Sequence, residues 1–362
     1  MRAGSGASAG TGRRPTIRDV GRRAGVSVGT VSHVMNGTAK VTPDKVQRVR
    51  EAIEELHYRP SHAASSLVRS RTATVAFSYV ASRLEGDLFK VAEMISLASG
   101  LSRHGLALLL APEADTGVAG GPSAVGRFAL ERRVDGVILT DVDLEPTRVT
   151  ELRGLGLPCV IYGSPPDAPL DAVDVDDRYG IAMAVDHLRS LGHSAIVFLS
   201  APLHEDYARE RLGAYLERME VHRLAPTVIQ AEGYRVLDGQ AAVLRHGALG
   251  GLTALIGATD QLALGALQAV GQLGLRVPAD LSVVGFDDIP MAESVLPGLT
   301  TIRQPIDRMS DALVGCLIAA MGREGPGAEG RRPAQLIAPE LVVRGTTAPA
   351  RGAGADADKG QP

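Results

Sequence analysis

The 362-residue sequence predicts a small α-helical head followed by an α/β body of two lobes. Residues 13–71 hold short helical patterns and carry twelve Lys or Arg against five Asp or Glu. From residue 74 onward, β-branched runs alternate with amphipathic stretches, which is typical of a parallel sheet covered by helices. These runs are too many for one sheet of ordinary size, so we expect two lobes with a cleft between them.

The chain divides into five expected segments. We expect a disordered arm at 1–14, the helical head at 15–60, a short helix with its linker at 61–73, the two-lobed body at 74–346 and a disordered tail at 347–362. Gly, Ser and Ala dominate the arm, and the tail has a similar composition, so neither can bury an apolar core.

Charge is distributed unevenly between the head and the body. Residues 13–71 have a net charge of +7 (twelve minus five), and because the chain totals −3, the remainder carries −10. A basic module joined to an acidic body indicates a polyanionic partner for the head alone. No apolar run could span a bilayer and the first residues lack a secretory signal, so we predict a cytoplasmic protein with no membrane partner.

Three helices are predicted in the head. Thr16, Ser27 and Thr42 are the candidate N-caps, each placed just before an amphipathic pattern. Gly25 makes a turn between the first and second helices, and Pro60 ends the third.

The second helix carries an unusual polar stripe. Val28, Val31, Val34 and Met35 recur at helical spacing, while the alternate face holds hydroxyls, an imidazole and an amide instead of Glu and Lys. A helix, a glycine turn and a second helix form a helix-turn-helix, whose second helix can lie in the DNA major groove. Phosphate would repel Glu there, whereas hydroxyls and N–H groups at the helix start can bind it. The alternative is an ordinary pair of core helices, which would not need the basic charge.

The segment "YRPSHAASSLVRSRT" predicts a further helix of about two turns. So short a helix is unstable alone, because nucleation is unfavourable. It could fold against DNA, with Leu67 as an apolar wedge between base steps in the minor groove. A plain linker is the alternative.

Taken together, these motifs resemble a known family. The stretch from "TIRDVGRRAGVSVGTVSHVMNG" through "VTPDKVQRVREAIEELHYRPSHAASSL" resembles the N-terminus of the LacI/GalR family of bacterial transcription regulators. "RLGAYLERM", "ATDQLALGALQAVGQLGLRVPADLSVVGFDDIP" and "PGLTTIRQP" are similar to family signatures in the body. The resemblance covers roughly residues 16–345 and implies a dimer. Each chain would have a helix-turn-helix head, a hinge helix and a periplasmic-binding-protein-like (type I) body whose lobes cross over near 174, 303 and 338.

The resemblance also implies the residues that contact double-stranded DNA. The recognition-helix positions are Ser27, Val28, Gly29, Thr30, Ser32, His33 and Asn36, of which Val28, Gly29 and His33 match base-reading positions. Phosphate-contacting positions match Thr16, Thr42 and Tyr58, and hinge positions match Ala64 and Leu67. Ser65 stands where the family often has Arg, which weakens the expected minor-groove contact.

A small-molecule effector is expected between the lobes. Arg211 lies at a helix start and could hold a hydroxyl pair or a carboxylate, or could instead pair with Glu210 or Glu217. Asp287 directly follows a strand, where ligands of open α/β sheets sit. The resemblance implies that Arg211, Asp287 and Tyr234 bind the effector, and Thr259, Asp260, Gln304 and Phe89 complete the candidate set. Gly163 replaces an acidic residue of many relatives, so the effector class, sugar or nucleoside and nucleobase, stays open.

No cofactor, metal or enzymatic activity is predicted. The sequence has no phosphate-binding glycine loop, no nucleophile motif and no cysteine pair with metal spacing. His187 and His193 lie near three aspartates in the sequence, but their spacing of six places them on different helical faces. We therefore predict a homodimeric, sequence-specific regulator, most simply a repressor, that binds a near-palindromic operator under effector control. A regulator without an effector, an activator and a solute-binding protein with the same body are the alternatives.

Overall fold

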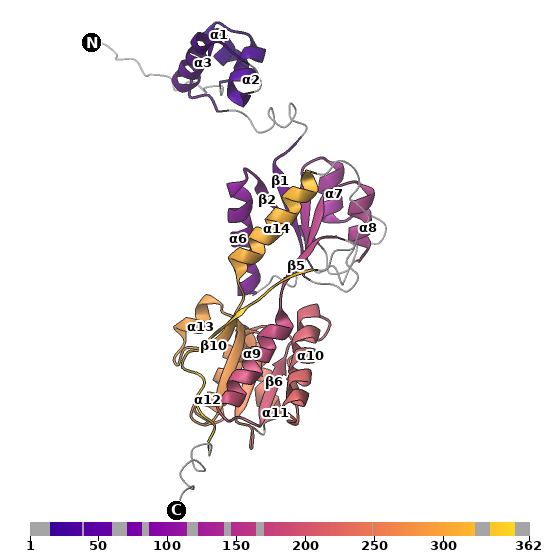
Figure 1. Ribbon diagram of the computed structural model, residues 1–362, viewed down its shortest axis with the longest axis vertical. Helices are drawn as coiled ribbons and strands as arrows, with labels where there is room; N and C mark the ends of the chain where they lie inside the picture. Colours follow the sequence, from indigo (N-terminus) through magenta and orange to yellow (C-terminus); the bar gives the residue numbers. More distant parts are fainter. Residues whose placement is uncertain are drawn as a thin grey trace, which may run out of the picture. The chain divides into compact units, whose positions relative to one another are not determined.

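The computed structural model describes residues 15–37, 40–59, 71–81, 87–113, 122–140, 146–163, 170–247, 249–322 and 334–351. The chain forms two compact units, Met1–Thr72 and Ala73–Pro362. They correspond to the head with its connecting segment and to the body (Figure 1).

The head contains three helices, α1 (Ile17–Ala24), α2 (Val28–Asn36) and α3 (Pro43–Glu55). Thr16, Ser27 and Thr42 are their N-cap residues, which confirms the predicted helix starts. Gly25 ends α1 with a φ of 63°, a left-handed conformation that glycine adopts without steric cost.

A small apolar core holds the three helices together. Val20, Val31 and Val49 are fully buried, and the ring of Tyr58 packs with them. Gly21 permits the close approach of α1 to the following turn, because a Cβ there would lie 3.0 Å from the carbonyl oxygen of Val26.

The first lobe of the body is a six-stranded parallel sheet in the order β11-β5-β4-β3-β1-β2. Its strands are β1 (Thr74–Val80), β2 (Ala107–Glu113), β3 (Gly136–Leu139), β4 (Cys159–Tyr162), β5 (Ala172–Val175) and β11 (Gln335–Ile337). Helices α6 (Leu88–Arg103) and α14 (Ile306–Met321) cover one face, and α7 (Ala124–Leu130) and α8 (Pro146–Gly154) the other (Figure 1).

Successive side chains of β1 pack alternately into the two hydrophobic cores of this lobe, one on each face of the sheet. Val75 and Phe77 pack with Leu97 and Leu313 from α6 and α14, while Ala76 packs toward α7 and α8. Both faces of the sheet are buried, which explains why the strands read as continuous apolar runs. Helix α14 lies beside α6 although more than 200 positions separate them (Figure 1).

The second lobe repeats this topology in the order β12-β10-β9-β8-β6-β7, with only β12 antiparallel to its neighbour. Its strands are β6 (Ile196–Ser200), β7 (Thr227–Gln230), β8 (Ala254–Gly257), β9 (Ser282–Asp287), β10 (Thr300–Arg303) and β12 (Glu340–Val342). Its helices are α9 (Asp177–Ser190), α10 (Asp206–Val221), α11 (Val236–His246), α12 (Asp260–Gln272) and α13 (Pro290–Ser294).

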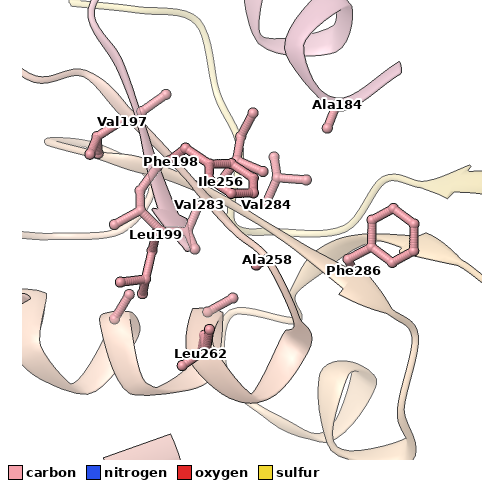
Figure 2. Close-up of a cluster of buried hydrophobic side chains, with 14 of the residues drawn as sticks. Ala184, Val197, Phe198, Leu199, Ile256, Ala258, Leu262, Val283, Val284 and Phe286 are labelled. Atoms are coloured by element: carbon pink, nitrogen blue, oxygen red, sulfur yellow. The ribbon is translucent and has the colours of Figure 1, made fainter. Parts of the chain in front are cut away.

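The core of the second lobe is built around β6, β8 and β9. Phe198, Ile256 and Val284 lie side by side on neighbouring strands and are fully buried (Figure 2). The chain leaves the first sheet after β5, returns to that lobe in α14 and enters the second sheet again at β12. The strand order changes direction between β1 and β3 in the first sheet and between β6 and β8 in the second. In open α/β sheets, ligands bind beyond the carboxyl ends of the strands at such a point.

The C-terminal end differs from the expectation. The packed body was expected to end at residue 346, but residues 343–351, here called the C-terminal strap, lie against the second lobe. The backbone N–H of Ala350 donates to the carbonyl of Leu191 at 2.8 Å, and Thr347 and Ala348 hydrogen-bond to histidine side chains. That boundary was therefore wrong, because composition does not reveal hydrogen bonds to residues far back in the chain.

Candidate functional site

The start of α2 presents an exposed polar surface on the head. Ser27, Gly29 and His33 are exposed, and Thr30 and Ser32 are half-buried. The Ser27 hydroxyl accepts from the N–H of Thr30 at 3.1 Å, so it caps the helix while remaining exposed. Val28 shares the helical spacing of the apolar residues but is 41% exposed, so its side chain is accessible on this surface.

The three predicted phosphate contacts have different surroundings. Thr42 is exposed and its side chain makes no capping bond, so its hydroxyl is accessible. The Thr16 hydroxyl donates to Asp19 at 2.7 Å, and Tyr58 buries its ring in the head core, leaving the residue 8% exposed. Ala64, Leu67 and the Asn36 side chain lie outside the described residues.

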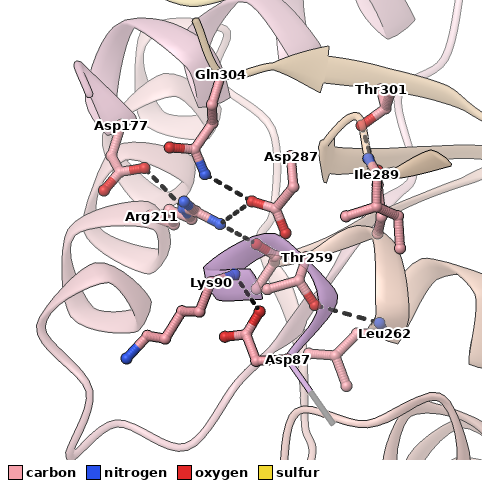
Figure 3. Close-up of polar contacts among 12 residues, drawn as sticks. Asp87, Lys90, Asp177, Arg211, Thr259, Leu262, Asp287, Ile289, Thr301 and Gln304 are labelled. Atoms are coloured by element: carbon pink, nitrogen blue, oxygen red, sulfur yellow. Dashed lines mark hydrogen bonds and ion pairs between the residues drawn. The ribbon is translucent and has the colours of Figure 1, made fainter. Parts of the chain in front are cut away.

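In the body, Arg211 on α10 is the centre of a buried polar cluster (Figure 3). Its Nε donates to Asp177 at 2.7 Å, and its Nη1 donates to the carbonyl of Ala258 at 2.6 Å and to Asp287 at 3.4 Å. The expected alternative, a pair with Glu210 or Glu217, is not made, because Arg178 contacts both of those carboxylates instead.

Aromatic rings and carboxylates stabilise the buried charge of Arg211. The guanidinium carbon lies 3.6 Å from the centroid of the Phe286 ring and 5.0 Å from that of Tyr207. Burial by itself would lower the pKa of Arg211, but the carboxylates of Asp177 and Asp287 raise it above its ordinary value. The side chain therefore stays charged and is held rigidly.

Asp287 ends β9 with a φ of 120°, an unusual conformation for a residue with a side chain. Its Oδ1 accepts from Gln304 Nε2 at 2.7 Å and from Arg211 (Figure 3). Burial raises the pKa of Asp287 to about 7, although the guanidinium of Arg211 opposes this shift. Strained backbone at a buried, titratable group is typical of binding sites.

Two of the candidate effector residues are used for internal bonds. The Thr259 hydroxyl caps α12 by accepting from the N–H of Leu262 at 3.2 Å (Figure 3). Asp260 is fully buried, and its two oxygens accept from the Ile289 N–H and the Thr301 hydroxyl. Asp260 therefore fixes the elements around the cluster and is not available as a ligand contact.

The remaining two candidates lie around the cluster. Phe89, on α6 of the first lobe, packs against the core of the second lobe. The N–H of Leu88 also crosses between the lobes, donating to the Gln261 side chain at 3.2 Å. Tyr234 is half-buried and lies within the electrostatic influence of Glu205 and Lys90. The two lobes thus contribute side chains to one region.

The structure adds acidic residues that the sequence reasoning missed. Asp87 caps α6, Asp177 is the first residue of α9, and Glu205 is the N-cap residue of α10. Burial raises the pKa of Asp87 and of Asp177, with Arg211 opposing the shift in both. Each of these three acidic residues precedes or begins an amphipathic run, so its position at a helix start could be predicted from the sequence. The sequence did not show that these helix starts lie close together.

Chemically, the cluster can bind hydroxyl groups. The Nη2 of Arg211 and the Oδ2 of Asp287 have no protein partner among the described residues. They provide a donor and an acceptor, which together match the donor and acceptor of a hydroxyl. Anions are disfavoured, because the helix starts that would attract them already carry Asp87, Asp177 and Glu205.

Neither a metal-binding group nor a membrane-spanning helix is present among the described residues. In that part of the chain, no three His, Cys, Asp or Glu side chains gather as a metal-binding group. Within the same ranges, no helix is both long and apolar enough to traverse a bilayer. His187 and His193 instead contact the C-terminal strap.

Comparison with known proteins identifies two kinds of domain. Residues 16–61 match the profile of bacterial regulatory proteins of the lacI family, and residues 185–347 match a periplasmic binding protein-like domain. The head is thus a helix-turn-helix DNA-binding domain joined to a body of the periplasmic-binding-protein type.

Two relatives match this chain over most of its length. The regulator MalR of Streptomyces coelicolor is 33% identical, over 93% of this chain and 97% of its own length. The lactose operon repressor of Escherichia coli is 30% identical, over 92% and 90%. This protein therefore belongs to the LacI family of transcriptional regulators.

Solved structures of the family agree with this assignment. The lac repressor dimer bound to operator and an anti-inducer aligns with a TM-score of 0.77 and 27% identity, covering 93% of this chain and all of that one. The complex of the regulator CelR with cellobiose aligns with a TM-score of 0.66 and 28% identity, covering 92% and 100%.

Proposed function

We propose that this protein is a homodimeric repressor that binds a near-palindromic operator and changes its operator affinity when a hydroxyl-rich small molecule binds between the lobes. Two heads would read the operator halves through α2, and Ala64 and Leu67 would contact its centre. The membership of the chain in a family of DNA-binding regulators supports the first part, and it also favours a regulatory over an enzymatic role.

The observation that carries the effector proposal is the Arg211 cluster. Its position beyond the carboxyl ends of β8 and β9 is where open α/β sheets bind ligands. The free donor on Arg211 and the free acceptor on Asp287 favour a neutral polyol, such as a sugar, over a carboxylate or phosphate. The binding of cellobiose by the related CelR is consistent with this choice.

Effector and operator binding would be coupled through the crossing segments. Asp177 begins the segment after β5, and Gln304 follows β10, so two of the crossings end at the cluster. A ligand that binds one lobe arrangement better than the other shifts the balance between them. Such coupling typically amounts to about 1–3 kcal/mol, and it is reciprocal between the two ligands.

A pair of variants tests this function. Arg211→Ala or Asp287→Ala should remove the response to effector while operator affinity stays within about threefold of the wild type. Thermal-shift screening with neutral mono- and disaccharides, nucleosides, nucleobases and sugar phosphates identifies the effector. Electrophoretic mobility shift then measures the response.

Arg178→Ala is the matched control, because Arg178 is an exposed arginine that pairs with Glu210 and Glu217 on the surface. It should respond like the wild type. A normal response in both cluster variants, or stabilisation by sugar phosphates alone, would contradict the proposed site.

A further inference from the structure

The C-terminal strap is attached to the second lobe in two halves of different chemistry. The inner half, residues 343–346, is held by groups that do not titrate near neutral pH. The Thr346 hydroxyl donates to the Val283 carbonyl at 2.7 Å and accepts from the Thr300 N–H at 2.8 Å. The N–H of Gly345 donates to the carbonyl of Gly298 at 2.8 Å. Thr346 is fully buried and anchors this half, whereas Val343 and Gly345 are exposed.

The outer half, residues 347–351, makes non-titrating bonds to Ser282, Thr300 and the Leu191 carbonyl, and it alone also contacts two imidazoles. Nε2 of His187, near the end of α9, is 3.0 Å from the Thr347 hydroxyl. Nε2 of His193, just beyond α9, is 3.0 Å from the carbonyl oxygen of Ala348 and must donate to it. His193 is almost completely buried, and its Nδ1 has no hydrogen-bond partner among the described residues.

We propose that the outer half of the strap is a proton-sensitive clasp, which closes while His187 and His193 are neutral and opens when they take up protons. The neutral ring of His193 satisfies the Ala348 carbonyl and leaves a bare Nδ1 that needs no partner. Protonation adds an N–H at Nδ1 in a buried place without an acceptor, which is costly unless the strap moves away.

Burial opposes protonation of both rings, and His187 also lowers the pKa of His193, whereas the hydrogen bond to the Ala348 carbonyl acts in the other direction. Arg189 on α9 donates to the His193 carbonyl, and the two imidazoles also repel each other when charged. The carboxylates that contact the strap pair with arginines, Asp280 with Arg276 and Arg351, and Asp288 with Arg303 and Arg344. In the described part of the chain, neither imidazole has a carboxylate partner that would stabilise its charged form.

The direction of the effect follows from these surroundings. Burial lowers the pKa of His187 and of His193 below the ordinary value of about 6.5. The open strap therefore binds more protons than the closed one below about pH 6.5. Closure is complete above this pH and is lost as the pH falls. The hydrogen bonds between Ala348 and Ser282 and from the Ala350 N–H to the Leu191 carbonyl do not titrate, so they oppose opening and limit how far the equilibrium moves.

Hydrogen exchange of the full-length protein at about pH 7.5 and pH 5.5 tests the clasp, after correction for the intrinsic pH dependence of exchange. We expect the outer half to exchange about tenfold faster at the lower pH, because opening takes up protons at two sites. The inner half should change far less, since none of its bonds in the described structure involves an imidazole.

A double variant, His187→Gln with His193→Gln, separates the clasp from general acid loosening. A glutamine amide can donate where Nε2 donates but does not titrate, so the outer half should stay closed at about pH 5.5. His246→Gln, at an exposed histidine ending α11, is the matched control and should keep the wild-type pH dependence.

Two results would overturn the clasp. One is equal acid acceleration in both halves of the wild-type strap, and the other is undiminished acceleration in the double glutamine variant. The wild-type comparison stands by itself if the double variant does not fold. Neither measurement involves an operator or an effector, so failure here is distinct from failure of the proposed function.

Discussion

Single residues of the Arg211 cluster combine structural and binding roles. Arg211 uses Nε and Nη1 to hold Asp177, Ala258 and Asp287, and has only Nη2 left for a ligand. Similarly, Oδ1 of Asp287 accepts hydrogen bonds from Arg211 and Gln304, which leaves Oδ2 for a ligand. A ligand therefore meets groups whose positions are already fixed, and preorganisation of this kind reduces the entropic cost of binding.

The raised pKa of Asp287 predicts a pH dependence of stability. The folded-state value of about 7 lies above the ordinary value of 3.8, so the folded protein binds an extra proton between these limits. Stability contributed by this group is present at low pH and is lost as the pH rises toward 7. Between about pH 5 and pH 8, the free energy of unfolding of Asp287→Asn should rise relative to that of the wild type by on the order of 2 kcal/mol. Urea unfolding at the two pH values measures this change.

If the difference in free energy of unfolding between Asp287→Asn and the wild type is the same at both pH values, Asp287 is ionised throughout that range. The neutral amide keeps the size of the side chain, so packing differences cancel between the two pH values.

At the level of elements, helix starts from both lobes gather around one site. Helices α6, α9, α10 and α12 begin there, and each begins with a carboxylate or a hydroxyl of the chain itself. The carboxylates interact favourably with the helix dipoles, which stabilises acidic groups in a buried place. The elements are further tied by Asp260, which joins the start of α12 to β10 and to the segment before α13.

Asp260 provides a test of that arrangement. Asp260→Ala should lower the free energy of unfolding by about 3 kcal/mol, because it leaves the buried Ile289 N–H and Thr301 hydroxyl without acceptors. Denaturant unfolding measures the loss. Asp311→Ala, which removes an exposed ion pair with Arg103, is the control and should cost less than about 1 kcal/mol. Equal losses would show that Asp260 is not a structural tie.

Much of the element structure could be predicted from local sequence. The N-caps Thr16, Ser27 and Thr42 and the apolar strand runs depend on neighbouring residues alone. The pairing of Asp177 with Arg211 could not be predicted in the same way, because 34 positions separate them and the sequence offered Glu210 and Glu217 as nearer partners.

At the level of the whole molecule, the N-terminal region is basic and the rest of the chain is acidic. The region 13–71 carries a net +7, from twelve basic and five acidic residues, within a chain of net charge −3. A basic head attracts the phosphate backbone, whereas an acidic body disfavours non-specific contacts with it.

This distribution predicts a steep salt dependence of operator binding. Affinity measured by fluorescence anisotropy should fall about 10³-fold or more between about 50 and 200 mM salt, as expected when two heads neutralise six or more phosphates. Effector affinity for the free protein should change little over the same range, since the Arg211 cluster is buried and therefore weakly screened. A flat operator dependence would contradict phosphate binding by the basic head.

The sequence by itself determined the order of the elements, the helix-turn-helix, the two-lobed α/β body and the choice of Arg211, Asp287 and Gln304. The elements follow from periodicity and capping, which are properties of neighbouring residues, whereas Arg211 and Asp287 were selected on the family resemblance and Gln304 on its place near a lobe crossing. Only the tertiary structure decided that Asp177 fixes Arg211, that Asp260 is buried and that His187 and His193 hold the strap. The physical reason is that burial and hydrogen-bond partners arise between segments far apart in the chain, which no local pattern encodes.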